Sequence, residues 1–139
     1  MIAHTTQVRV SYAATDQMGF VYHGRMVEYL EIARTDLVRA AGLPYSEVEA
    51  RGVWMPVAEL TIKYIRPAHY DDVLTLRTVV REKPMATFRF ESEISREDGT
   101  LIAKATVVLA FIDATRKRPM RVPDFIAAAV EENWGKELA

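Results

Sequence analysis

The sequence predicts an α+β fold in which an antiparallel sheet wraps around one long helix. Two observations favour this class. Apolar residues follow helical spacing over residues 24–42, and from Val53 to about Ala114 the spacing changes to the two-residue alternation of strands. A helix with one apolar face needs an apolar surface to cover it, and a curved sheet provides that surface. The length of 139 residues indicates a single domain, residues 1–139.

The N-terminal part of the chain is expected to supply one strand and the long helix. Residues 6–12 alternate as a half-buried strand should. After a polar loop, the helix is expected to begin at about His23 and to end where Gly42 can adopt a left-handed conformation. The apolar face of this helix has i, i+4, i+7 spacing and comprises Met26, Leu30, Ala33, Leu37 and Ala40.

The rest of the chain is expected to form four long strands in a meander-like order. The strands are predicted at residues 54–67, 73–82, 85–96 and 101–114. The segment "EDGT", Glu97–Thr100, is typical of a tight hairpin turn. The last strand is apolar on both faces from Val107 to Ile112, which predicts a central place in the sheet. Short helices are expected at residues 44–52 and 124–134, with a basic loop at 115–123.

Composition excludes several classes of function. Eighteen basic and nineteen acidic side chains leave a net charge of -1, so no global field would attract nucleic acid or an anionic membrane. The chain has no cysteine, which excludes disulfides, a thiolate nucleophile and a Cys-ligated zinc. No secretory signal pattern and no membrane-spanning apolar run is present, so we expect a cytoplasmic protein without membrane insertion. The three histidines are far apart in sequence, and we expect neither a metal nor another cofactor.

The candidate chemistry lies in one loop, "ATDQMGFVYHGRM", Ala14 to Met26. Asp16 precedes His23 by seven residues, and the long helix is expected to start there. A helix N-terminus presents unpaired N–H groups that stabilise a developing oxyanion, and a nearby carboxylate can take a proton from water or attack a carbonyl carbon itself. The same residues also fit a plain turn, in which Asp16 caps its own backbone, Gly19 supplies a positive φ and His23 is structural.

The chain resembles a known family over roughly Val8 to Pro123. The segments "VRVSYAATDQMGFVYHGRMVEYLEIARTDLVRAAG" and "ELTIKYIRPAHYDD" are similar to hot-dog-fold acyl-CoA thioesterases of the 4-hydroxybenzoyl-CoA thioesterase type, above all to the branch associated with the bacterial Tol-Pal system. The resemblance implies a hot-dog fold, with the sheet wrapped around the long central helix. It also implies a homo-oligomer, either a dimer with one continuous sheet or a tetramer, and an active site between protomers.

The resemblance assigns the catalytic roles within the matching "D-Q-M-G-x-V-Y-H". The family's catalytic aspartate falls on Asp16, as base or nucleophile. The backbone N–H that polarises the thioester carbonyl falls on His23, whose imidazole has at most a supporting role. Tyr22 and Gly19 shape the same loop. The implied substrate is an acyl-CoA or an acyl-carrier-protein thioester, hydrolysed to a free acid and a thiol.

Contacts with coenzyme A are less well defined because the chain departs from the family pattern. Related proteins often have a basic pair before the Ser/Thr-Phe of the third long strand, where this chain has Met85 and Ala86 ahead of Thr87. We take Lys83 and Arg118 as the substitutes that hold the phosphates, with Arg116 and Lys117 behind them. Thr87 and Glu59 complete the substrate-binding candidates. For Glu59 the alternative is a cross-strand ion pair.

Three other functions remain open from the sequence. A hydratase or dehydratase of the same fold would place its acid and base elsewhere. A non-catalytic acyl-CoA-binding module would bind the ester without releasing a thiol. A scaffold linked to envelope machinery is suggested by the branch resemblance alone.

Overall fold

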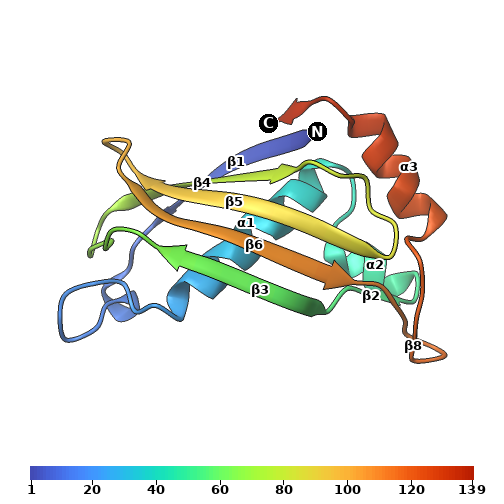
Figure 1. Cartoon of the computed structure of the whole chain (residues 1–139), viewed down its shortest axis with the longest axis horizontal. Helices are drawn as coiled ribbons and strands as arrows, with labels where there is room; N and C mark the ends of the chain where they lie inside the picture. The colour runs from blue at the N-terminus through green and yellow to red at the C-terminus, as the bar shows by residue number, and fades with distance from the viewer.

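The computed structural model describes all residues from Met1 to Ala139. A six-stranded sheet curves around one long helix (Figure 1). The strand order is β3-β6-β5-β4-β1-β9. All neighbouring strands are antiparallel except β1 and the short β9, which are parallel. The bounds are β1 Ile2–Arg9, α1 Arg25–Ala40, β3 Val57–Tyr64, β4 Val73–Val80, β5 Thr87–Arg96, β6 Leu101–Ala110 and β9 Glu137–Leu138.

The core lies between α1 and the concave face of the sheet. Met26, Leu30, Ala33 and Leu37 are each at most 3% exposed, which confirms the predicted apolar face of the helix at four of its five positions, while Ala40 is only half-buried. They pack into one cluster with alternate residues of the sheet, among them Phe88 from β5. Gly42 has a φ of +90° and ends the helix as expected, because glycine carries no Cβ penalty there.

The predicted meander is wrong for one strand. β4, β5 and β6 follow one another in space, but β3 pairs with β6 and not with β4. Residues 65–72 therefore cross the end of the sheet before the chain enters β4. Alternation in the sequence identifies strands but does not identify their partners, since pairing is decided by distant segments. The predicted central place of the last long strand is confirmed, because β6 lies between β3 and β5.

Several smaller elements differ from the expectation. β1 begins at Ile2 and ends at Arg9, and Tyr12 lies in a single 3₁₀ turn, Tyr12–Ala14, with its side chain exposed. The predicted basic loop contains a short hairpin strand. A second, small sheet holds β2 (Val53–Trp54), β7 (Ile112–Asp113) and β8 (Arg118–Pro119). The remaining helices are α2 (Tyr45–Ala50) and α3 (Asp124–Asn133), both within the predicted ranges.

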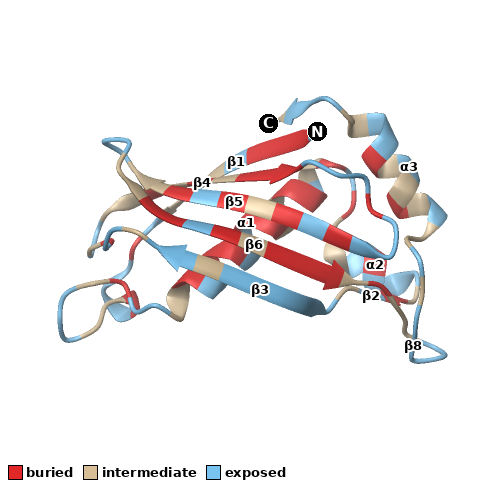
Figure 2. Ribbon diagram, in the orientation of Figure 1, coloured by how far each residue is buried: buried red, intermediate tan, exposed pale blue.

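β3 forms a free edge of the large sheet. It pairs with β6 on one side only, and every residue of β3 except Ile62 is exposed. Figure 2 shows this exposed strand beside the buried β6 and the buried inner side of α1. None of the helices is long and apolar enough to cross a membrane.

Candidate active site

The loop that carries Asp16 is held in one conformation by the backbone. Thr15 and Val21 form an isolated antiparallel bridge, and the Asp16 N–H donates to the Phe20 carbonyl at 2.8 Å. The Val21 N–H donates to Ala68 at 2.8 Å, which ties the loop to the segment that follows β3. Gly19 adopts a φ of +80°, a conformation that favours glycine, and so permits the tight turn.

Only one oxygen of the Asp16 carboxylate takes part in the hydrogen bonds of the turn. Its Oδ1 accepts hydrogen bonds from the N–H groups of Met18 at 2.9 Å and Phe20 at 3.3 Å. Its Oδ2 accepts none from the protein. The turn interpretation of this residue is therefore correct for one oxygen, and the second oxygen is free to accept a proton from a ligand or water.

The chain enters α1 with two backbone donors unused. The Arg25 and Met26 N–H groups bond to the carbonyls of Tyr22 and His23, while the N–H groups of His23 and Gly24 donate to no group of the protein. The helix starts at Arg25, two residues later than expected, so these donors lie in the turn before it. Unpaired N–H groups at this end of a helix favour a negatively charged oxygen.

Tyr64, the last residue of β3, fixes the position of this turn. Its hydroxyl donates to the His23 carbonyl oxygen at 2.8 Å, and its ring meets the His23 ring edge to face at 6.4 Å between centroids. Desolvation raises the pKa of the Tyr64 hydroxyl further above neutral pH, so the hydroxyl stays a hydrogen-bond donor. Sequence analysis missed this role because a strand tyrosine gives no signal of a partner forty-one positions away.

A cavity of about 330 Å³ connects these groups. Apolar side chains form most of its wall, and the residues lining it include Asp16, Met18, Phe20, His23, Met26 and Tyr64. Tyr22 does not line it. Its ring stacks on His23 at 4.3 Å and lies so close to Gly24 that a Cβ at this glycine would meet the Tyr22 ring at 2.9 Å. Tyr22 therefore supports the loop from outside the cavity.

Four of the five predicted substrate-binding residues lie at the opposite end of the protomer. Glu59, Lys83 and Thr87 line one hollow of about 410 Å³, and Arg118 lies on the short strand β8. The Asp16 loop lies at the left end of the sheet in Figure 1, whereas the β4–β5 connection and β8 lie at the right end. Within one chain, the structure thus brings Gly19 next to Asp16 but does not bring the other four candidates there.

Lys83 and Glu59 have surroundings that the sequence did not indicate. The Lys83 ammonium pairs with Glu131 of α3 at 2.9 Å and lies 5.3 Å from the centre of the Trp134 ring. Any phosphate at Lys83 would compete with these contacts. Glu59 has no cross-strand ion pair within the chain, since it lies opposite Val108 of β6.

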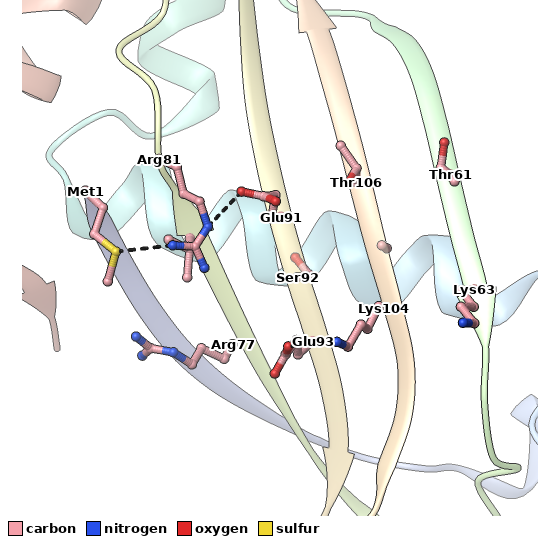
Figure 3. Close-up of a pocket in the computed structure, with 12 residues that line it drawn as sticks. Met1, Thr61, Lys63, Arg77, Arg81, Glu91, Ser92, Glu93, Lys104 and Thr106 are labelled. Atoms are coloured by element: carbon pink, nitrogen blue, oxygen red, sulfur yellow. Dashed lines mark hydrogen bonds and ion pairs between the residues drawn. The ribbon is translucent and has the colours of Figure 1, made fainter.

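A larger hollow, of about 420 Å³, lies on the convex face of the sheet (Figure 3). It is lined by alternating acidic and basic side chains, including Arg81 and Glu91, which pair at 2.9 Å. It contains none of the predicted site residues. No group of three or more His, Asp or Glu side chains in the molecule is close enough to hold a metal ion.

Three comparisons with known proteins all find similarity to thioesterases. Residues 10–130 match the model of the thioesterase-like superfamily. The acyl-CoA thioesterase YbgC of Haemophilus influenzae is 35% identical over 123 residues, which cover 88% of this chain and 90% of that protein. The crystal structure of a DHNA-CoA thioesterase from Staphylococcus aureus superimposes with a TM-score of 0.88 at 29% identity, covering all of both chains.

A second similar structure carries a substitution of an aspartate. It is a mutant 4-hydroxybenzoyl-CoA thioesterase, with asparagine in place of an aspartate, in complex with 4-hydroxybenzoyl-CoA. It is 26% identical, has a TM-score of 0.81 and covers 91% of this chain and 97% of that one. These likenesses confirm the predicted α+β hot-dog fold. Membership of the Tol-Pal-associated branch stays a prediction.

Proposed function

Because the chain belongs to the thioesterase-like superfamily, we propose that it is a thioester hydrolase that cleaves acyl-CoA, with Asp16 as base or nucleophile. The observation that carries the proposal is the arrangement in the cavity of about 330 Å³. Asp16, with its free Oδ2, and His23, with its unpaired N–H, line the same cavity. Acyl transfer needs both groups.

The chemistry follows from these two groups. The thioester carbonyl oxygen accepts hydrogen bonds from the N–H groups of His23 and Gly24, which draws electrons away from the carbonyl carbon. As base, Asp16 takes a proton from water while the water oxygen attacks that carbon. As nucleophile, its carboxylate attacks instead, and water then hydrolyses the resulting anhydride. In both routes the carbon–sulfur bond breaks, and the thiolate leaves and takes up a proton.

The substrate class rests on the relatives. Proteins of this similarity are described as acyl-CoA thioesterases, and one similar structure, at 16% identity and thus alike in fold alone, is described in complex with CoA. An acyl-carrier-protein thioester presents the same reacting group and is the alternative substrate. We further propose that hydrolysis needs no metal or other cofactor and that the protein acts in the cytoplasm.

The exposed edge strand supports a homo-oligomer. An unpaired strand edge is a ready template for another chain, and proteins normally cover it. β3 carries Leu60 and Tyr64 at 39% and 49% exposure on the face that looks toward α1. A second copy that adds its own β3 to this edge would cover both the backbone and these side chains. A dimer of this kind is the simplest assembly, and a tetramer would need a further contact.

The test replaces Asp16 with asparagine. In Asp16→Asn the side-chain amide keeps an oxygen for the Met18 N–H, so the turn should hold, but the amide can neither accept the proton nor attack. We expect kcat to fall by about a hundredfold or more with a melting temperature close to wild type. Release of free thiol from short, long and aromatic acyl-CoAs measures the effect.

Asp113→Asn is the matched control. The Asp113 Oδ1 also accepts backbone N–H bonds in a turn, from Thr115 and Arg116 at 3.0 Å, but it lies outside the cavity. The activity of this variant should stay within a few-fold of wild type. Wild-type activity in Asp16→Asn would remove Asp16 from the mechanism. Binding of CoA esters without thiol release by the wild type would instead indicate a non-catalytic module, and hydration of an enoyl-CoA would indicate a hydratase.

A further inference from the structure

The Asp16 cavity contains a positively charged side chain that the proposed chemistry leaves unused. Arg66 is the only lysine or arginine among the residues that line the cavity, and Asp16 is the only carboxylate. Neither of them takes part in any of the ten ion pairs of the molecule. No carboxylate of the protein therefore neutralises the Arg66 guanidinium.

The backbone that carries Arg66 is bonded both to the sheet and to the Asp16 loop. The Arg66 N–H donates to the Ile102 carbonyl, at the start of β6, at 3.1 Å. Two residues later, the Ala68 carbonyl accepts the N–H of Val21 at 2.8 Å, and Val21 belongs to the Asp16 loop. The fold thus sets where the Arg66 side chain starts relative to Asp16.

Most hydrogen-bond donors of the Arg66 guanidinium are free. Its Nη1 donates to the carbonyl oxygen of the neighbouring Ile65 at 3.2 Å, and no other group of the protein accepts a bond from this side chain. Arginine has five N–H donors in a planar fork, and this fork matches the two oxygens of a carboxylate. Because Arg66 is exposed, a ligand that enters the cavity from solvent can reach these donors.

An anionic group that reaches Arg66 in this cavity lies close to the reacting thioester. Asp16 and Arg66 line the same space of about 330 Å³. This volume is near the lower end of the range for ligand pockets, about 300–1,000 Å³. In a CoA ester the long pantetheine arm separates the phosphates from the thioester, whereas a carboxylate at the end of a short acyl chain is only a few bonds away. The acyl group is thus the part of the substrate that can bring an anion to Arg66 while the thioester is at Asp16.

We propose that Arg66 selects short acyl groups that end in a carboxylate, so that the substrates are monothioesters of dicarboxylic acids. This inference names the substrate class of the proposed thioester hydrolase and rests on that function. The Arg66 fork binds the terminal carboxylate through two charge-assisted hydrogen bonds. The negative charge of Asp16 would otherwise repel such a substrate, so the Arg66 charge also decides whether it enters the cavity. Hydrolysis then releases a dicarboxylic acid and the thiol.

Two CoA esters of equal carbon number test this selection. Glutaryl-CoA ends in a carboxylate and pentanoyl-CoA ends in a methyl group. We expect the kcat/KM of the wild type to be higher for glutaryl-CoA by about tenfold or more, the range of hydrogen bonds to a charged group. Arg66→Gln should lose this preference, and Arg66→Lys should keep part of it, since the charge stays and the fork is lost.

Arg121→Gln is the matched control for Arg66→Gln. Arg121 is also an exposed arginine, and it lies outside the cavity. Its variant should keep the wild-type preference for glutaryl-CoA. An equal loss of kcat/KM with both esters in Arg66→Gln would overturn the inference, because Arg66 would then act on the thioester or on the phosphates.

Pantetheine thioesters separate the acyl carboxylate from the phosphates of CoA, because they contain no phosphate. The wild type should prefer glutaryl-pantetheine to pentanoyl-pantetheine by the same factor as for the CoA esters, and Arg66→Gln should again lose the preference. A preference that disappears with the pantetheine esters would overturn the inference.

Binding measured by calorimetry separates this inference from the proposed function. A wild type that binds glutaryl-CoA more tightly than pentanoyl-CoA, and loses the difference in Arg66→Gln, but releases no thiol fails only the proposed function. A wild type that hydrolyses both esters with equal kcat/KM fails only the inference. Equal binding of the two esters without hydrolysis contradicts both.

Discussion

The Asp16 carboxylate uses its two oxygens for different purposes. Oδ1 closes the turn through Met18 and Phe20, and Oδ2 is free at the cavity. The turn and the catalytic interpretation of this residue are compatible, because a carboxylate has several lone pairs. A carboxylate that is bonded to its own loop through one oxygen keeps its free oxygen in a defined position. This is the arrangement expected of a preorganised group.

Tyr64 is predicted to be a positioning residue. Tyr64→Phe removes only the hydroxyl that holds the His23 carbonyl, so the neighbouring N–H groups lose one restraint. We expect kcat to fall about two- to tenfold, the range of one hydrogen bond, with KM nearly unchanged. Steady-state kinetics with one good acyl-CoA substrate give both constants.

Tyr70→Phe serves as the comparison for Tyr64→Phe. Tyr70 is exposed, packs edge to face on Tyr12 at 5.6 Å and lies outside the cavity. Its variant should match wild type in both constants. Equal kinetics in the two variants would show that the Tyr64 hydroxyl does not position the turn.

At the scale of elements, α1 has two functions at once. Its apolar face fills the concave side of the sheet, and the turn before it presents the unpaired N–H groups of His23 and Gly24. The packing of the helix fixes where its N-terminal end lies relative to the Asp16 loop. Changes deep in the core are therefore expected to reach the site through the position of this helix.

Leu37→Ala tests the contribution of this packing. Leu37 is 1% exposed, so the substitution removes buried methyl groups and leaves a cavity. We expect the free energy of unfolding to fall by about 2–5 kcal/mol. Chemical denaturation measures the loss. Ile32→Ala on the exposed side of the same helix should change stability by less than about 0.5 kcal/mol, and an equal loss there would contradict the assignment of faces.

Among elements, those defined by local spacing were predictable and their partners were not. The spacing of Met26, Leu30 and Leu37 predicted α1, and "EDGT" predicted the β5–β6 turn, where Gly99 has a φ of +87°. The pairing of β3 with β6 depends on segments far apart in the chain, and the local pattern is the same for any partner. The prediction of β3 from its alternating residues was likewise correct, although the alternation did not show that the strand is exposed on both faces.

At the scale of the whole molecule, β3 connects the two regions that contain the candidate site residues. The Asp16 cavity lies at one end, and the hollow with Glu59, Lys83 and Thr87 lies at the other. In the proposed homo-oligomer, a second copy that pairs antiparallel along β3 would set the start of one β3 beside the end of the other. The two kinds of hollow would then be neighbours across the interface.

The proposed dimer predicts that activity depends on protein concentration. Below the dissociation constant each chain loses the partner's wall of the cavity, so the activity per chain should fall as dimers dissociate. Activity assays over a dilution series, matched to sedimentation at the same concentrations, check this. Constant activity per chain across the transition from dimer to monomer would contradict a shared site.

The sequence alone was sufficient for the fold class, the long helix and the position of Asp16. These features depend on local periodicity and on a contiguous motif, "DQMGFVYHG", in which Asp16 and the helix start are close along the chain. The sequence also shows the charge of Glu59, but it does not show that this carboxylate lacks a cross-strand ion pair within the chain.

Only the tertiary structure decided how distant residues meet. In the folded chain the Tyr64 hydroxyl donates to the His23 carbonyl and Lys83 pairs with Glu131. β3 is left at the edge of the sheet, with one side unpaired. Each of these contacts joins segments separated by more than forty positions or depends on which strand takes which neighbour. Such contacts are set by the packing of the whole sheet around α1, and no local pattern carries that information.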